Sequence, residues 1–307
     1  MCDHIIRTLT NRSLQTITNV YQLQFVDFKP PGFGDYIRGC FTLCQIIHTV
    51  NEFCGTNIAF DMDLRNHPLC RHIVIENTDD SVNYPAIGNF HIDVLKVAKD
   101  VNDIAFQHIL TESIKYVNKL RVPNFYTFCC KYEIYYDIAP ADKARIRAKL
   151  VPNAAMNALI DGVLGGLSLV SGEYSVIHVR CNDEVSFPPK DMPAAYLETI
   201  RAKVLENTPT ETAPHLLVSN NDQVKVFLRS ANIVTAHYPL CHLGQDTAQS
   251  AEETQNTMLD FFLLSRAKNI LAFSEYGHGT GFSEECAKLY DVPYTCIKLP
   301  LLSEGKN

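Results

Sequence analysis

The chain has 307 residues, of which 46% are hydrophobic and 20% are charged, and its formal net charge is −7. This composition is that of a globular protein and excludes a largely disordered chain. The negative charge argues against a protein that follows a nucleic-acid backbone. The 11 cysteines include no C-x-x-C pair, so we expect neither a zinc site nor a disulfide framework.

The N-terminal residues contain no continuous apolar run of the kind found in a signal peptide. No later stretch approaches the roughly 18 uninterrupted apolar residues that a membrane span requires. We therefore expect a cytoplasmic protein with reduced cysteines, no membrane span and no nucleic-acid partner.

The first expected strand covers Tyr21–Phe28, and the prolines that follow would end it. Apolar residues at helical spacing then predict a helix over Tyr36–Cys54. Between the two lies Gly32-Phe33-Gly34-Asp35, a glycine turn at a helix N-terminus, where backbone N–H groups can bind an anion. The turn fails the dinucleotide fingerprint because the next glycine is Gly39. It is either an anion site or a simple turn.

A second strand is expected over Thr56–Phe60, directly before Asp61-Met62-Asp63. Two carboxylates in a D-x-D pattern can hold a divalent cation on a nucleotide-sugar pyrophosphate, or can simply be turn residues. The elements expected next are a strand over 71–76, a polar loop over 77–89, a helix over 94–120, strand and loop over 125–138, and helical residues 142–167 with breaks at Pro152 and Gly162.

The second half alternates strands with helices. Strands are expected over 174–179, 215–218, 233–236, 269–273 and 294–298, and helices over 194–206, 223–230, 257–267 and 283–290, with a long polar loop over 244–255. This alternation predicts βαβ units and a parallel sheet. Glycines on both sides of residue 168 indicate a boundary there, which gives domains of 1–168 and 169–307.

Chemically useful side chains gather at three of the predicted strand ends. His178, Arg180 and Asp183 end one strand, Ser219 to Asp222 follow another, and a glycine-rich loop over 274–283 ends a third. Ligands of open α/β sheets bind at the carboxyl ends of strands, and the fork of an arginine matches phosphate oxygens. Taken singly, His178 is typical of a buried core histidine and Asp222 of a helix N-cap. Their convergence on one sheet edge favours a phosphate-containing ligand.

These segments resemble the α1,6-fucosyltransferases, including the bacterial nodulation enzymes, and more distantly the α1,2- and protein O-fucosyltransferases. His178-Val179-Arg180 with Asp183 is similar to the H-x-R-R-x-D motif of that family, and Ser219 to Asp222 to its S/T-D-D segment. The run from Thr257 to Ala267, which contains Asp260, resembles the third motif. Gly32 to Asp35 resembles the N-terminal glycine loop. The resemblance is dense from about residue 174 to residue 290.

The resemblance implies a GT-B glycosyltransferase in which two Rossmann-like domains face each other across a cleft. It implies inverting transfer of fucose from GDP-fucose to a glycan hydroxyl, in glycan biosynthesis, without a metal or another cofactor. The first domain would serve the acceptor and the second would bind the nucleotide sugar.

Site roles are also implied by the resemblance. Arg180 would hold the β-phosphate and stabilise the leaving GDP, His178 would support the nucleotide, and Asp222 would accept hydrogen bonds from guanine. Asp260 would orient the phosphate loop rather than contact the donor. The remaining donor-binding residues are Gly32, Phe33, Gly34, Asp183, Ser219, Ser274, Tyr276, Gly277, His278, Gly279, Thr280, Gly281, Phe282 and Ser283.

Two departures from the family pattern bear on these roles. Cys181 stands where the second arginine of the first motif is expected, and Asp35 stands where an asparagine or similar residue follows the glycine loop. The general base that inverting transfer requires is open among Glu184, Asp35 and Asp63. Two alternatives remain: a transferase for another nucleotide sugar, with a metal held by Asp61 and Asp63, or a catalytically silent nucleotide- or glycan-binding protein.

Overall fold

A computed structural model gives the fold. It describes residues 16–21, 31–55, 57–75, 87–90, 124–129, 137–181, 191–208, 214–243, 250–276 and 279–301. The chain divides into two compact units, Met1–Val151 with Gly244–Asp246, and Pro152–Leu243 with Thr247–Asn307. The division comes earlier than the predicted 168/169. The reason is that the helix before residue 168 packs against a helix of the second unit.

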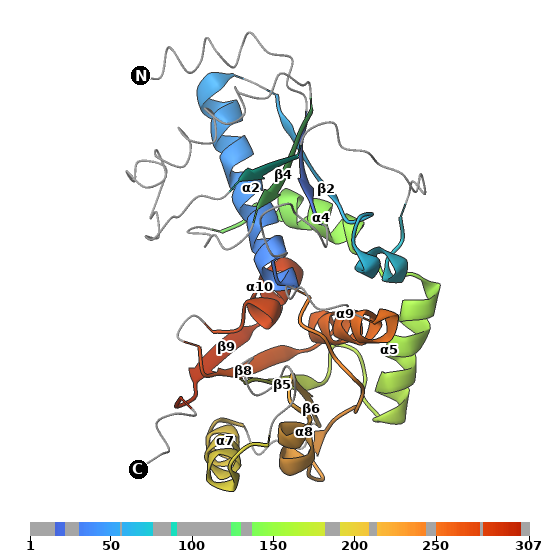
Figure 1. Cartoon of the computed structure of the whole chain (residues 1–307), viewed down its shortest axis with the longest axis vertical. Coiled ribbons are helices and arrows are strands. Elements are labelled where there is room, and N and C mark those ends of the chain that lie inside the picture. Colours follow the sequence, from blue (N-terminus) through green and yellow to red (C-terminus); the bar gives the residue numbers. More distant parts are fainter. Residues whose placement is uncertain are drawn as a thin grey trace. The chain divides into compact units, whose positions relative to one another are not determined.

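The first unit contains a four-stranded parallel sheet in the order β2-β1-β4-β3 (Figure 1). Its strands are β1 (Thr16–Val20), β2 (Ala59–Asp63), β3 (Ile87–Phe90) and β4 (Asn124–Cys129). Helix α2 (Phe33–Cys54) packs against β1, β2 and β4. Its residues Ile37, Phe41, Cys44 and Ile47 are buried, as their helical spacing predicts. The helix ends at Gly55, whose positive φ of 61° suits a residue without a Cβ.

Helix α4 (Pro140–Lys149) completes the described part of the first unit and contacts α2. The imidazole of His48 on α2 lies 2.7 Å from the buried carboxylate of Asp142 on α4. Pro140 occupies the first turn of α4, where its missing N–H costs no hydrogen bond.

Several expectations for the first half are wrong in position. The first described strand is Thr16–Val20, which was not predicted, and of the strand expected over Tyr21–Phe28 only Tyr21 lies within the described residues. The second is Ala59–Asp63, since its pairing with β1 continues to the Val20–Asp63 partners, so both aspartates lie within the strand. Residues Pro68–His72 form a short 3₁₀ helix where a strand over 71–76 was expected. The His67 side chain accepts a hydrogen bond from the Leu69 N–H and so starts a helical turn.

Other first-half expectations are confirmed or lie outside the described residues. Strand β4 confirms the strand expected within 125–138, and β3 lies at the end of the expected polar loop 77–89. The helix over 94–120 falls on residues that are not described. Pro152 does separate two helices, α4 and α5 (Ala154–Gly166), but α5 continues through Gly162.

The second unit contains a five-stranded parallel sheet in the order β7-β6-β5-β8-β9. The strands are β5 (Ser175–Arg180), β6 (His215–Ser219), β7 (Ile233–Val234), β8 (Asn269–Ser274) and β9 (Tyr294–Lys298). From β5 the chain moves outward to β7, then returns to place β8 on the other side of β5. The strand order therefore reverses between β5 and β8, and ligands of open α/β sheets bind at such a point.

Helices cover both faces of this sheet (Figure 1). They are α5, α7 (Ala194–Asn207), α8 (Asp222–Leu228), α9 (Ala251–Ser265) and α10 (Gly281–Tyr290). Ile177 and Val179 of β5 pack with residues of α7 and α8 in one apolar core. Because side chains alternate along a strand, His178 and Arg180 face the opposite side, which carries α9 and α10.

The parallel α/β architecture and the strands and helices of the second half are confirmed, with most ends within two residues. Helix α9 is the main exception, because it begins at Ala251, within the expected polar loop. Ser250 and Glu253 form a capping box there, and both hydrogen bonds are 3.0 Å long. Among the described helices, none has the length and apolar character needed to cross a membrane.

Candidate functional site

The carboxyl ends of β5, β6 and β8 bring the three predicted segments together at one edge of the sheet, where Val179 of β5 is in register with Ser219 of β6. Arg180, the last residue of β5, pairs in register with Ser274, the last residue of β8. These two strands border the point where the sheet order reverses. The first predicted motif and the glycine-rich loop therefore share one sheet edge.

His178 is a buried link between these two segments. Its Nδ1 lies 2.8 Å from the Ser283 hydroxyl on α10. The centroid of its ring lies 6.4 Å from that of the Phe282 ring. Burial and, to a smaller extent, the positive charge of Arg180 lower the pKa of His178 to about 3. At neutral pH the imidazole is uncharged, so it offers one donor and one acceptor.

Arg180 lies at the rim of the site. Its guanidinium donates to the Cys181 carbonyl at 3.1 Å and lies over the Tyr276 ring, 5.7 Å from its centroid. The face of an aromatic ring attracts a cation, and a guanidinium carries its N–H donors in a planar fork that matches phosphate oxygens. An arginine held in this way is suited to a phosphate group.

The loop from β8 to α10 is shaped by its own hydroxyl groups. Ser274 Oγ accepts from the Tyr276 N–H and donates to the Gly279 carbonyl, both at 3.1 Å. Gly279 has a φ of +79°, a conformation that costs little only for glycine. Thr280 Oγ1 hydrogen-bonds the Ser283 hydroxyl and lies 3.1 Å from the Tyr294 hydroxyl. Gly281 begins α10, and the Thr280 side chain does not cap the helix.

The segment after β6 is built differently from its sequence prediction. The N-cap of α8 is Asn221, whose Oδ1 accepts from the Gln223 and Val224 N–H groups. Ser219 is fully buried, and its hydroxyl accepts from the Asn221 N–H at 3.2 Å. Asp222 is the first helical residue, and its side chain is 67% exposed. Of the polar residues in this segment, Asp222 is thus the one presented to solvent.

A buried lysine lies beneath Asp222. The side chain of Lys225 is 2% exposed, and its Nζ is 3.5 Å from Asp222 Oδ1 and 5.0 Å from the centroid of the Tyr238 ring. The Tyr238 hydroxyl donates to the buried Asp260 on α9. Burial raises the pKa of Asp260 to about 6, although Lys225 and Tyr238 oppose the shift. Asp260 is therefore enclosed within the second unit.

The glycine turn of the first unit contains one core residue. Gly32 is the N-cap of α2, and Phe33 and Gly34 lie in its first turn. The Phe33 ring is 2% exposed and stacks with Tyr36, their centroids 6.4 Å apart. The Asp35 carboxylate pairs with Arg38 one turn along, at 3.2 Å. Phe33 therefore serves packing, whereas Asp35 is the polar group of this turn.

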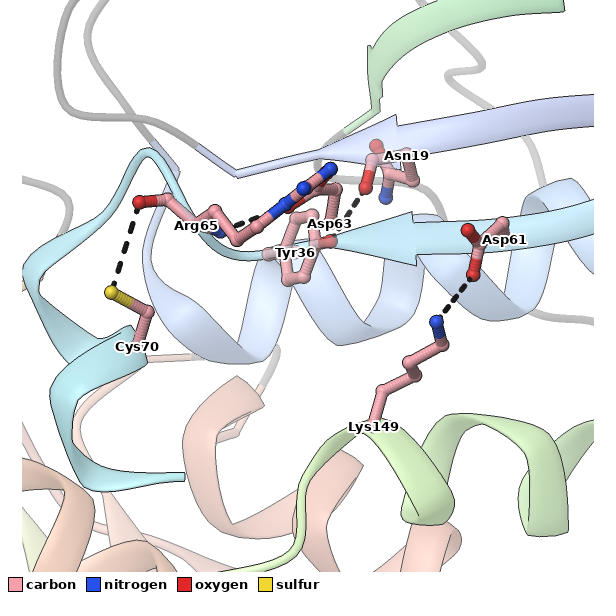
Figure 2. Close-up of polar contacts among 7 residues, drawn as sticks. All are labelled: Asn19, Tyr36, Asp61, Asp63, Arg65, Cys70 and Lys149. Carbon is pink, nitrogen blue, oxygen red and sulfur yellow. Dashed lines mark hydrogen bonds and ion pairs between the residues drawn. The ribbon is translucent and has the colours of Figure 1, made fainter. Parts of the chain in front are cut away.

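Asp61 and Asp63 are each paired with a cationic side chain (Figure 2). Asp61 lies 3.1 Å from Lys149 Nζ, and Asp63 receives two hydrogen bonds from Arg65 Nε, at 3.0 and 2.9 Å. Among the described residues there is no group of three or more histidine, cysteine, aspartate or glutamate side chains that could hold a metal ion. A metal at this D-x-D would have to displace both cations.

Four predicted site residues lie outside the described part of the chain: Asp183, Glu184, Gly277 and His278. Three residues at or beside this sheet edge were given no individual role by the sequence: Asn220, Glu275 and Lys225. Asn220 makes two hydrogen bonds to the backbone of Cys181, at 2.9 and 3.0 Å, and so continues the β5–β6 pairing with a side chain. Glu275, directly after β8, is 2% exposed, and Lys225 holds Asp222. The position of Glu275 beside a strand end and the i,i+3 spacing of Lys225 were available signals.

Comparison with known proteins gives a fold but no close relative. No family model matches the sequence, and no curated protein matches it. A solved structure of the NodZ α-1,6-fucosyltransferase soaked with GDP-fucose matches with 12% identity and a TM-score of 0.50, over 90% of this chain and 92% of that one. NodZ from Bradyrhizobium matches with 11% identity and a TM-score of 0.49, over 89% and 91%.

A plant enzyme gives a similar match. A variant of Arabidopsis thaliana FUT1 in complex with GDP matches with 11% identity and a TM-score of 0.49, over 97% of this chain and 74% of that one. The likeness to the NodZ structure soaked with GDP-fucose shows that this chain has the α/β fold of a GT-B fucosyltransferase. The expected resemblance is thus confirmed at the level of the fold.

Proposed function

We propose that this protein is an inverting glycosyltransferase that transfers fucose from GDP-fucose to a glycan hydroxyl without a metal ion. The observation that carries the proposal is the junction of two motifs at the reversal point of the second sheet. There, His178 is hydrogen-bonded to Ser283 and Arg180 is in register with Ser274. The protein with the same fold was soaked with GDP-fucose, which supports this choice of donor.

Arg180 has the central role in this mechanism. When the bond from the sugar to GDP breaks, negative charge develops on the β-phosphate, and a fixed guanidinium stabilises that charge. The Tyr276 ring holds the guanidinium in place. The neutral imidazole of His178 maintains the position of Ser283 and of the first turn of α10, where backbone N–H groups can face phosphate oxygens.

Asp222 is the proposed reader of the base. A carboxylate can accept two hydrogen bonds from the N1–H and N2–H₂ groups of guanine, whereas uracil offers only one N–H on its pairing edge. The buried Lys225 holds this carboxylate from below, and Asp260 with Tyr238 encloses Lys225. Selection of GDP over UDP would follow from this arrangement.

The general base belongs to one of three carboxylates: Asp35, Asp63 and Glu184. In the structure Asp35 is paired with Arg38 and Asp63 with Arg65, so the acceptor would have to compete with a cation for either one. Replacing each by its amide separates them, because only loss of the base lowers kcat by orders of magnitude while leaving GDP binding intact.

The test is a thermal-shift titration of the full chain with GDP, UDP, dTDP and GDP-fucose. Ligand binding to the folded state raises its stability by RT ln(1 + [L]/Kd), about 2.7 kcal/mol at a hundredfold excess over Kd. We expect a shift with GDP and GDP-fucose, none with UDP, and its loss in Arg180→Ala. Arg201→Ala is the matched control, because Arg201 is an exposed arginine on α7 that, like Arg180, lies over an aromatic ring, 5.9 Å from the centroid of Phe227.

Transfer itself needs a second measurement. Wild-type protein should release GDP from GDP-fucose in the presence of a glycan acceptor or water, with no loss of rate in EDTA. A shift with UDP but not GDP would overturn the guanine assignment. Binding of GDP with no turnover would make the chain a silent binding protein, and loss of turnover in EDTA would restore the metal-dependent alternative.

A further inference from the structure

The first unit contains a pocket at the carboxyl end of β2. It has a volume of about 200 Å³ and is lined by residues 61–65 of β2 and the following turn, residues 73–75 beyond the 3₁₀ helix, and residues 148–149 at the end of α4. Pockets for drug-sized ligands range from about 300 to 1,000 Å³. This pocket is therefore of a size for one small ring rather than for an extended ligand.

Four charged side chains line the pocket, and they form two ion pairs (Figure 2). Asp63 and Arg65 make the inner pair, in which the Arg65 N–H also donates to Asp63 at 2.9 Å. Asp61 and Lys149 make the outer pair, and each of these side chains is 41% exposed. Two negative and two positive groups leave the lining without net charge.

The rest of the lining is largely apolar. Leu64 and Ile73 are buried, but Val74 is 49% exposed, an unusual exposure for a large aliphatic residue within a pocket. The Val74 N–H donates to the Val151 carbonyl at 2.8 Å, which fixes the backbone that carries this exposed side chain. A ligand with a C–H face would cover Val74 and gain its apolar surface.

The paired charges discriminate between classes of ligand. A cation would have to displace Lys149 or Arg65, and a phosphate would meet two carboxylates. A neutral hydroxyl, in contrast, can donate to Asp61 and accept from Lys149 at once, so the charge balance is kept. Two neighbouring hydroxyls on a ring with apolar C–H faces match both features of the pocket.

We propose that this pocket binds one uncharged sugar ring, with its hydroxyls against the Asp61–Lys149 pair and a C–H face on Val74. The inner pair of Asp63 and Arg65 is a positioning pair that sets the end of β2. That the bound sugar is part of the glycan acceptor rests on the proposed glycosyl transfer. That the pocket binds a sugar at all is independent of it.

The experiment measures sugar binding by the full chain without any nucleotide. The probes are methyl β-galactoside, methyl β-glucoside and N-acetylglucosamine, with glucuronate and glucosamine as charged comparators, followed by ligand-observed NMR. We expect at least one neutral sugar to bind in preference to both charged ones. Asp61→Asn and Lys149→Met should each weaken binding about tenfold or more, as expected for a lost charge-assisted hydrogen bond.

Lys203→Met is the matched control, because Lys203 pairs with Glu206 on the surface of α7 at a similar exposure of 43%. It should leave sugar binding unchanged, and GDP should still stabilise all three variants. The proposal is overturned if no neutral sugar binds, if charged sugars bind better, or if both pocket variants bind like the wild type. Sugar binding without a GDP shift would leave the pocket standing and remove the transferase.

Discussion

Each unit carries an arginine at the carboxyl end of a parallel strand, and the two are used differently. Arg65 lies two residues beyond β2, and its guanidinium donates to both carboxylate oxygens of Asp63, the last residue of that strand. Arg180, the last residue of β5, donates to the Cys181 carbonyl and lies over an aromatic ring. An arginine that binds a carboxylate of its own strand fixes the backbone, whereas one held by a ring and a carbonyl suits an incoming anion. The partners, rather than the place in the fold, decide the role.

The largest expected effect comes from breaking the inner ion pair of the first unit. Arg65→Leu should lower the free energy of unfolding by about 2 kcal/mol, because it leaves the nearly buried Asp63 without its cation. This is below the loss for a fully buried pair because Arg65 is 28% exposed. Urea denaturation measures the change. Arg180→Leu should cost under about 1 kcal/mol. Equal losses would contradict the distinction between the two arginines.

An effect of similar size is expected from the loop between β8 and α10 in the second unit. Gly279→Ala should destabilise the chain by about 2 kcal/mol, since it strains a positive φ and places a Cβ 3.3 Å from Cys296 Sγ. Gly172→Ala is the control with a φ of +80° but no atom near its Cβ, and should cost about 1 kcal/mol. In a Cys296→Ala background, Gly279→Ala and Gly172→Ala should lower the free energy of unfolding by the same amount. If the difference persists in that background, the contact with Cys296 is not its cause.

Asn220 offers a test of how the end of β5 is held. Asn220→Ala removes two hydrogen bonds to the Cys181 backbone and should cost about 1 to 2 kcal/mol. Hydrogen exchange at the Cys181 amide should become faster. Asn207→Ala on α7 removes an exposed hydrogen bond of 2.8 Å and should change neither quantity. Unchanged exchange at Cys181 would mean that the strand end does not depend on this side chain.

The last effect is a pH dependence of the second unit, which is spread over about two pH units. Burial raises the pKa of Asp260 from 3.8 to about 6, so between these values the folded state holds the proton more tightly than the unfolded state. This contribution to stability is complete below about pH 4 and is lost as the pH rises to about 6, at roughly 1 kcal/mol per pH unit. His178, with its pKa of about 3, acts in the opposite direction.

The difference between wild type and Asp260→Asn isolates this contribution, because the His178 term is present in both proteins. The difference in unfolding free energy should change between pH 4 and 6 and be flat above pH 7. A flat difference over the whole range would mean that Asp260 is ionised at all these pH values in the folded chain.

The strands and helices of the second unit could be predicted because they alternate regularly along the sequence. The first unit lacks this alternation, and its elements were harder to predict. Strands such as β5 and β8 are short, largely apolar runs with glycine or polar residues beyond them, so local patterns sufficed. The turn at His67 and Pro68 depends on one side chain that caps the next N–H, and this overrides the apolar run that follows. The start of α9 depends on the capping box of Ser250 and Glu253, which a polar composition concealed.

Site residues at the ends of strands could be predicted from the sequence. Contacts between residues far apart in the sequence could not. His178 and Arg180 are placed by their strand, but the bond from His178 to Ser283 joins residues far apart in the sequence. The same holds for Asp61 and Lys149, because the lysine that pairs with the first carboxylate of the D-x-D pattern lies far from it in the sequence. Lys225 shows the limit most clearly, because a lysine gives little sign in sequence that it is buried.

The position of Cys296 beside the glycine-rich loop makes it a natural reporter. Among the cysteines whose exposure the structure gives, it is the exposed one, and its sulfur lies where a Cβ on Gly279 would make contact. Burial of part of the side chain raises its pKa, so the thiol reacts slowly at neutral pH and faster in mild alkali. Its rate of alkylation, read by peptide mass, therefore reports on the surroundings of this loop, and a ligand that covers the thiol would slow the reaction without any engineered probe.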